Sequence, residues 1–332
     1  MKKILFFLLL ILFSCSNDET QISEPVVDDL YFPAIDSDQW ETINHEELNW
    51  DSVGIENLYN FLQLNNTRAF VVLKDGKIVL ENYWGNNVLN TAPFDSNSNW
   101  YWASAGKTLT AFLVGIAKDN GILSLEDSSS IFLGNGWTSL EESQESLIKI
   151  KHHLTMTTGL DYLVDNLDCT DPNCLTYKNT PGTNWFYHNA TYSLLKDVIE
   201  NASETTYNDF TNQKVKMQIG MGGSWIQSNY SNIYWSTARD MARFGLLILN
   251  EGVWDNQVIL SDTNYFSNMV NTSQQMNESY GYLWWLNGKD SLIPPGITFP
   301  IQTSLASNAP EDLIAGMGKN GQYLDVIPSQ NL

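Results

Sequence analysis

Apolar residues recur every three or four positions in five stretches of the chain, which is the spacing of an amphipathic helix. These stretches are 52–64, 104–120, a short one beginning at 152–156, 189–201 and 237–249. The first places Ile55, Leu58, Phe61 and Leu62 on one face, and Gly121 is a typical residue to end the second. Asn189 stands at the start of the fourth stretch, where it is a candidate N-cap.

Strand-like runs of β-branched and aromatic residues lie toward both ends of the chain. Residues 68–73 and 77–83 are two such runs, and Asp75-Gly76 between them is a strong hairpin turn. Similar runs return late, at 281–286 and 322–327. No internal repeat is present, so one large domain is expected.

Strands at both ends with helices between them predict an α+β fold, in which an antiparallel sheet is flanked by helices and an all-helical lobe is inserted. The expected sheet lobe covers about 46–106 and 275–332, and the helical lobe covers about 107–274. With 43% apolar and 17% charged residues, the 332-residue chain can bury such a core. Its net charge of −21 would repel phosphate backbones, so we expect no nucleic-acid partner.

The N-terminus has the features of an export signal. Lys2 and Lys3 precede an apolar run at 4–13 that is too short for a usual membrane span. The run ends in Leu12-Phe13-Ser14-Cys15, which resembles a bacterial lipobox, so 1–15 is predicted to be a lipoprotein signal and Cys15 the lipidated residue. An ordinary signal peptide that contains a cysteine is the alternative. Residues 16–45 are polar and acidic and are predicted to form a tether.

These features place the protein in the bacterial cell envelope, as an outer-membrane or periplasmic lipoprotein held to the membrane through Cys15. The acidic residues after Cys15 favour exposure at the cell surface. In an exported protein, Cys169 and Cys174 are expected to form a small-loop disulfide. The four histidines do not repeat at metal-ligand spacing, so we expect no metal and no cofactor.

Candidate chemistry begins with Ser-x-x-Lys, which on a helix places the lysine amine one turn below the serine hydroxyl. A buried, neutral lysine could take the hydroxyl proton. The pattern occurs at Ser104/Lys107, Ser146/Lys149 and Ser193/Lys196. Ser146 precedes a segment, 148–151, that we interpret as extended and facing solvent, and Ser193 lies inside a predicted helix that would hide its hydroxyl. Ser104 starts a helix and is followed by two small residues, although an N-cap serine near a surface lysine would look the same.

Tyr-x-Asn is a second candidate pattern, because a phenol beside a lysine ammonium can lose its proton near neutral pH and act as a general base. It also occurs three times, at Tyr177/Asn179, Tyr187/Asn189 and Tyr230/Asn232. Each could equally be a loop tyrosine with a capping asparagine, and the pattern alone does not choose among them.

Several motifs in order carry a family resemblance. They are Ser104-Ala-Gly-Lys107, Leu154-Thr-Met-Thr-Thr-Gly-Leu160, Pro181-Gly-Thr-Asn-Trp-Phe-Tyr187-His-Asn189 with Tyr192-Ser-Leu-Leu195, and Ser236-Thr-Ala-Arg-Asp-Met-Ala-Arg-Phe-Gly245. Together they resemble the β-lactamase-related serine hydrolases, which include class C β-lactamases, DD-peptidases, esterases and 6-aminohexanoate-dimer hydrolases. The resemblance covers roughly residues 46–332, the predicted hydrolase domain, and implies a β-lactamase/transpeptidase-like fold.

The resemblance also implies roles for single residues. Ser104 would be the acylated nucleophile, and Lys107 would accept or relay its proton. Tyr187 would return the proton to the leaving group and activate the deacylating water. Asn189 would bind the substrate carbonyl or hold Lys107. The backbone N–H of Ser104 would be one of two oxyanion donors.

The family has a further active-site motif, called here the third motif, which is a strand with Lys or His followed by Thr or Ser and Gly. The chain departs from the family at this third motif. Here the sequence is Ala315-Gly-Met-Gly-Lys-Asn-Gly-Gln322, which allows two registers. In the preferred one, Gly316-Met317-Gly318 takes the place and the Lys319 N–H is the second oxyanion donor. In the other, Lys319-Asn320-Gly321 takes it and Gln322 donates. The preferred register removes the cation that binds a β-lactam carboxylate.

The expected function is therefore that of a serine hydrolase acting through an acyl-enzyme on a small ester, amide or peptide. A β-lactamase or D-Ala-D-Ala carboxypeptidase is one alternative. A non-catalytic cell-surface binding protein on the same fold is another, although the presence of both Lys107 and Tyr187 argues against it. The sequence after 322–327 ends where the family continues with another strand and a helix, so a truncated C-terminus is also expected.

Overall fold

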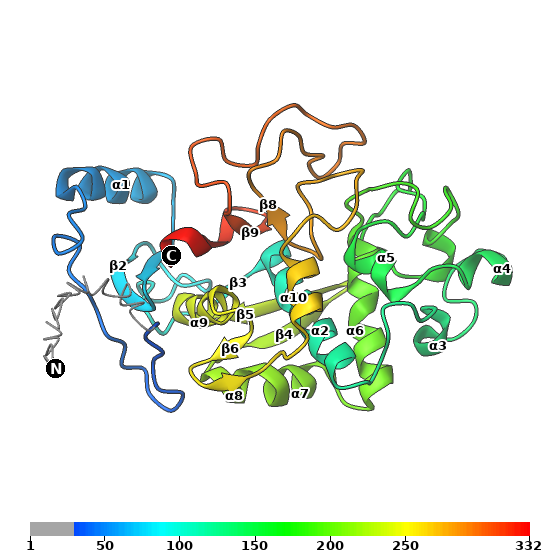
Figure 1. Ribbon diagram of the computed structural model, residues 1–332, viewed down its shortest axis with the longest axis horizontal. Helices are drawn as coiled ribbons and strands as arrows, with labels where there is room; N and C mark the ends of the chain where they lie inside the picture. Colours follow the sequence, from blue (N-terminus) through cyan, green and yellow to red (C-terminus); the bar gives the residue numbers. More distant parts are fainter. Residues whose placement is uncertain (1–29) are drawn as a thin grey trace, which may run out of the picture.

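Segments from the two ends of the described chain lie side by side. The computed structural model describes residues 30–332, so the predicted signal 1–15, the lipidation site Cys15 and residues 16–29 lie outside it. The backbone N–H of Asp75 donates to the carbonyl of Asn331 at 3.0 Å, and the Lys74 amine donates to the carbonyl of Gln330 at 2.9 Å. The C-terminal segment, red in Figure 1, is thereby tied to the N-terminal hairpin.

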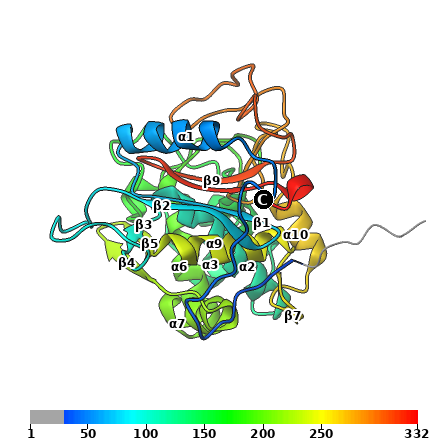
Figure 2. The same cartoon turned by 90° about the vertical axis from the view of Figure 1, so that its left-hand side faces the viewer.

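Two antiparallel sheets make up this part of the molecule. β1 (Ala69–Lys74) and β2 (Lys77–Tyr83) form the predicted hairpin, with Asp75 in the turn at a positive φ of 52°. The second sheet has the strand order β10-β9-β8, from Gln322–Val326, Ile314–Gly318 and Trp285–Leu286. Figure 2 shows β1, β2 and β9 as a layer with α1 (Ser52–Leu64) on one side. On the other side lie α2 (Gly106–Asp119), α6 (Asn189–Ser203) and α9 (Ala238–Leu249). The predicted α+β fold is confirmed.

The helices gather mainly between these end strands in sequence. Their bounds are α2 Gly106–Asp119, α3 Ser130–Leu133, α4 Glu142–Glu145, α5 Ile150–Leu154, α6 Asn189–Ser203, α7 Tyr207–Thr211, α8 Met217–Ile219, α9 Ala238–Leu249 and α10 Thr263–Met269. α2 is the central one, because each of its residues from Gly106 to Ala117 is buried. A helix surrounded on all sides is held rigidly by its neighbours, here α6, α10 and β9.

A third sheet, of order β3-β5-β4, was not predicted from the sequence, and two of its strands fall within 107–274, so the lobe predicted to be all-helical also contains strands. This sheet consists of β3 Trp100–Tyr101, β5 Ser231–Ser236 and β4 Ser224–Ser228, and a separate small hairpin pairs β6 Val253–Trp254 with β7 Gln257–Val258. The third sheet leads the chain into α2, because Trp102 donates its backbone N–H to Tyr234 at 2.8 Å and its indole N–H to the Ser236 hydroxyl at 2.8 Å. The start of α2 is therefore fixed to β5.

Several element boundaries differ from the prediction. His188 is the N-cap of α6 and Asn189 is its first helical residue, which frees the Asn189 side chain for another partner. The run at 281–286 is a strand only at its last two residues, since Leu283 has a φ of 61° that breaks an extended path. The segment 148–151 is not extended and solvent-facing: Ile148 and Ile150 are fully buried and α5 begins at Ile150.

The predicted tether, 16–45, extends too far toward the C-terminus, because it includes residues 30–45, which belong to the folded domain. Residues from 30 onward pack on the domain, and Arg243 is one of the residues that hold them. Its buried guanidinium donates to the carbonyls of Ala34 and Ser37 at 3.0 and 2.9 Å, and to that of Ile219 at 2.8 Å. Over residues 30–332, no helix is both long enough and apolar enough to cross a membrane.

Candidate active site

Ser104 lies in a single 3-10 turn, η1 (Ala103–Ala105), immediately before α2. Ala103 adopts a left-handed φ of 48°, which is unfavourable for a residue with a Cβ and turns the chain sharply before Ser104. Trp102 on one side is held by β5, and Ala105 on the other is completely buried. The Ser104 side chain, partly exposed, is therefore presented at a rigid corner of the fold.

Lys107 contacts the Ser104 hydroxyl directly. Its amine donates to Ser104 Oγ at 2.9 Å and to Asn189 Oδ1 at 3.0 Å, and the residue is only 2% exposed. Burial lowers the pKa of Lys107 to about 7, against the opposing field of the Asp168 carboxylate. A substantial fraction of this amine is thus unprotonated at neutral pH and can accept a proton. Asn189, from the start of α6, holds the amine in place.

Tyr187 is in the segment just before α6, and its ring stacks on Trp285 of β8 with centroids 5.8 Å apart. Burial raises its pKa to about 12, although a hydrogen bond to Ser104 acts in the other direction. Burial thus favours the neutral phenol in the resting site, and the role expected for Tyr187, which is to return the proton to the leaving group and activate the deacylating water, stays a prediction. Desolvation disfavours the phenolate, and Lys107 is the group that can be an unprotonated base.

β9 passes alongside η1 and brings two glycines of the third motif against it. A Cβ added at Gly318 would lie 2.5 Å from the carbonyl oxygen of Trp102, and one at Gly316 would lie 3.0 Å from a methyl carbon of Thr108. This close approach requires glycine. Lys319 follows the strand at the surface, and Asn320 begins the left-handed part of the turn at a φ of 67°. The strand residues beside η1 are therefore Gly316-Met317-Gly318, as in the preferred register. The residues of the other register, Lys319-Asn320-Gly321, lie in the turn after β9.

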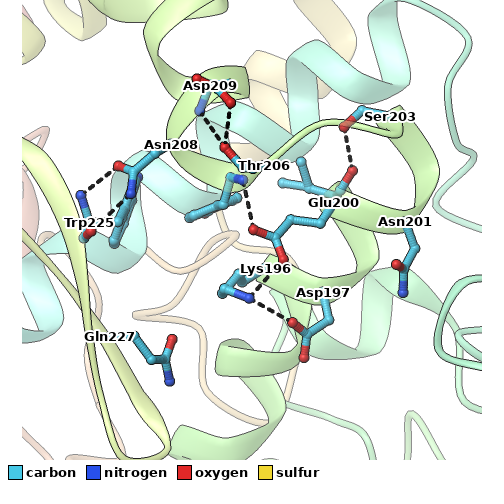
Figure 3. Close-up of polar contacts among 12 residues, drawn as sticks. Lys196, Asp197, Glu200, Asn201, Ser203, Thr206, Asn208, Asp209, Trp225 and Gln227 are labelled. Carbon is cyan, nitrogen blue, oxygen red and sulfur yellow. Dashed lines mark hydrogen bonds and ion pairs between the residues drawn. The ribbon is translucent and has the colours of Figure 1, made fainter.

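The other Ser-x-x-Lys pairs are engaged elsewhere. Ser146 is exposed and donates to the Ser143 carbonyl, while the Lys149 amine binds Glu126. The Lys196 amine binds Asp197 and Glu200, each at 2.8 Å. Both contacts can be followed in Figure 3. Burial lowers the pKa of Lys196, but these two carboxylates outweigh burial and raise it above its ordinary value. Lys196 thus stays an ammonium, in contrast to Lys107.

The other Tyr-x-Asn tyrosines have partners away from Lys107. The Tyr177 hydroxyl is 3.4 Å from that of Thr180, and the Tyr230 hydroxyl donates to Asp171 at 2.5 Å. Both side chains are at the surface. Of the three tyrosines, Tyr187 is the one beside Ser104 and Lys107.

Some residues near Lys107 were not expected from the sequence. Tyr192 of α6 places its ring centroid 4.1 Å from the Lys107 amine, and its position three residues after Asn189 on a helix could have indicated this. Asp168 acts electrostatically on Lys107, His188 and Tyr192. Asp168 precedes the Cys169–Cys174 disulfide loop, and no sequence pattern points to it. Among residues 30–332, no cluster of side chains suitable for a metal ion is found.

A family model described as Beta-lactamase matches residues 67–332, and the chain belongs to this family. Solved structures share the fold at low identity. A Bacillus anthracis protein assigned as a 6-aminohexanoate-dimer hydrolase is 19% identical, with a TM-score of 0.62 over 82% of this chain and 74% of its own. A Bacteroides dorei protein assigned as a β-lactamase is 18% identical, with a TM-score of 0.64 over 85% of this chain and 89% of its own.

A third solved structure, the octameric penicillin-binding protein homologue of Pyrococcus abyssi, is 16% identical, with a TM-score of 0.60 over 85% of this chain and 72% of its own. No curated protein matches the chain. At these identities the solved structures show the fold alone and do not identify the reaction.

Proposed function

We propose that the protein is a serine hydrolase that acts through an acyl-enzyme formed on Ser104. The observation that carries this proposal is the buried Lys107 amine, which is 2.9 Å from Ser104 Oγ and has a pKa of about 7. An amine that is partly unprotonated at neutral pH, within hydrogen-bond reach of a hydroxyl, is suited to remove its proton.

The expected reaction begins when Lys107 takes the Ser104 proton and Oγ attacks the substrate carbonyl. The backbone N–H groups of Ser104 and Lys319 would stabilise the resulting oxyanion, and Gly316 and Gly318 allow β9 to approach closely enough. The neutral Tyr187 phenol would protonate the leaving group, and the resulting phenolate would take up the proton that the neighbouring Lys107 ammonium removed from Ser104. A water molecule would then attack the acyl group by the same steps in reverse. Asn189 would keep the Lys107 amine in position throughout.

The absence of a cationic side chain from the strand part of the third motif favours neutral substrates. β9 is Ile-Ala-Gly-Met-Gly from Ile314 to Gly318, and it carries no group that would bind a carboxylate beside Ser104. We therefore infer that small esters and amides are better substrates than penicillins or the carboxylate-terminated peptides of a D-Ala-D-Ala carboxypeptidase. Peptidase activity on other small peptides is consistent with the same site.

A substrate panel tests this inference. Short-chain esters or small amides are expected to give kcat/KM values at least about tenfold above those for penicillins and cephalosporins, because a carboxylate that finds no cationic partner in a binding site typically weakens binding by that much or more. The measurement is steady-state hydrolysis of each class by the same preparation, with the Ser104→Ala variant as background. Faster turnover of a β-lactam than of any ester or amide would favour the β-lactamase alternative.

We also propose that the protein is a lipoprotein of the bacterial cell envelope, anchored through Cys15. Support comes from the sequence of residues 1–15, in which two lysines, a short apolar run and Cys15 follow one another. Cys15→Ser is expected to move the protein into the soluble fraction, since one modified cysteine would supply the anchor. Fractionation of cells that express both forms measures this, with Cys169→Ser as a control that should remain with the membrane. A Cys15→Ser protein that stays membrane-bound contradicts the proposal.

A further inference from the structure

The amine of Lys107 lies close to two aromatic rings. Its nitrogen is 4.1 Å from the ring centroid of Tyr192 and 4.8 Å from that of Tyr187. Both distances are within the range at which a cation is attracted to the face of an aromatic ring. Tyr187 has a role in the proposed reaction through its hydroxyl, whereas Tyr192 has none so far.

Tyr192 is held firmly in this position. It lies on α6 three residues after Asn189, so the two side chains project from the same face of the helix toward the same amine. Its hydroxyl points away to β5, where it donates to the carbonyl of Asn232 at 3.2 Å, and the residue is 9% exposed. The ring, and not the hydroxyl, is therefore the part of Tyr192 presented to Lys107.

Besides the hydrogen bond to Asn189 Oδ1 at 3.0 Å, the charge that Lys107 acquires in the reaction has little other support. Among the described residues, no carboxylate forms an ion pair with its amine; Asp168 acts only through its field, from the loop before α6. The other titratable groups facing the amine are the phenols of Tyr187 and Tyr192, both kept neutral because burial raises their pKa. β9 contributes none between Ile314 and Gly318. In so desolvated a site an aromatic face is at its most effective toward a cation.

We propose that Tyr192 is a positioning residue whose ring face stabilises the ammonium form of Lys107 while Lys107 holds the Ser104 proton. This inference rests on the proposed function. The proton leaves Ser104 Oγ for the Lys107 nitrogen and later passes to the Tyr187 phenolate; Tyr192 neither gives nor takes a proton. Its contribution is to lower the free energy of the transient Lys107 ammonium inside the core.

The experiment replaces Tyr192 by Phe and by a series of phenylalanines with one, two and three ring fluorines. Fluorination keeps the shape of the ring and drains the negative charge from its face, so folding is preserved while the attraction for a cation falls. The readout is the rate at which a fluorophosphonate probe labels Ser104, measured as a function of pH. Tyr192→Leu, which removes the ring, completes the series.

We expect Tyr192→Phe to keep the wild-type pH profile within about 0.3 units. Each added fluorine is expected to move the midpoint of the acidic limb to lower pH, since a less stabilised ammonium loses its proton more readily. The total shift should approach about one pH unit, with a fall in the plateau rate of about tenfold. The same fluorinated residues at position 207, whose ring packs on Trp225 with a centroid distance of 5.0 Å, are the control and should show no trend.

A labelling profile that does not respond to fluorination at position 192 overturns the proposal. So does a Phe variant as impaired as the Leu variant, because it would assign the effect to the hydrogen bond with Asn232 and not to the ring. If wild-type Ser104 is not labelled at all, the proposed function itself fails, and this inference fails with it.

Discussion

Replacing Lys107 with Met is expected to lower kcat/KM for an ester substrate by about 100- to 10,000-fold, the range seen when a general base is lost. The change removes the amine that contacts Ser104 Oγ at 2.9 Å, while an apolar side chain of similar length fills the buried space. Steady-state kinetics at pH 8 measures the effect. Lys196→Met, in the Ser193/Lys196 pair of α6, is the matched control and should retain nearly full activity.

The pH dependence of the wild-type enzyme gives an independent check on Lys107. Its pKa is lowered from 10.5 to about 7 by burial, and the reactive form is the neutral amine. kcat/KM should therefore be low below pH 6, rise with a midpoint near 7 and level off above pH 8. This rising limb should be absent from the residual activity of Lys107→Met. A loss in Lys196→Met as large as that in Lys107→Met would contradict the assignment of the base.

The second large effect is expected from Tyr187→Phe, which should slow turnover by about 100-fold or more because the leaving group loses its proton donor. The Phe ring can keep the stacking on Trp285, so the melting temperature should change little. The loss should be greatest for amides, whose leaving nitrogen must be protonated, and smaller for esters with good leaving groups. Rates on a matched ester and amide measure both the size and the pattern of the effect.

Tyr230→Phe is the control for this second prediction. Tyr230 belongs to the same Tyr-x-Asn pattern, but its hydroxyl binds Asp171 at the surface. Its replacement should leave the rates on both substrates within about twofold of wild type. If Tyr230→Phe is the damaging change and Tyr187→Phe is not, the wrong tyrosine has been placed at the site.

Much of the local structure around Ser104 follows from sequence periodicity. The apolar stripe of 104–120 predicted the helix, and helical spacing alone places Lys107 one turn from Ser104. The Asp75 turn and the helix at 52–64 were likewise predicted by local rules. The contact between Lys107 and Asn189 is different: it joins residues 82 positions apart, and only the ordered set of family motifs suggested that they meet.

Other features could not be predicted because they depend on tertiary surroundings. The β3-β5-β4 sheet pairs Trp100 with Ser236 across a segment that contains α2 to α8, and the two-residue strand β3 leaves no periodic signal. The protonation state of Tyr187 depends on its burial, which its sequence neighbours do not reveal. The field of Asp168 at Lys107 is set by how one loop packs against α6, where the Ala190 N–H donates to the Leu167 carbonyl at 2.8 Å.

The central claim, that Ser104 is an activated nucleophile, is tested most directly by covalent labelling with a fluorophosphonate probe followed by peptide mass spectrometry. The predicted result is a single adduct on Ser104, formed faster as the pH rises through 7. It should be lost in a folded Ser104→Ala protein and retained in Ser146→Ala and Ser193→Ala. Absence of an adduct on wild-type protein would favour a non-catalytic binding protein on this fold. An adduct that persists in Ser104→Ala would contradict the claim outright.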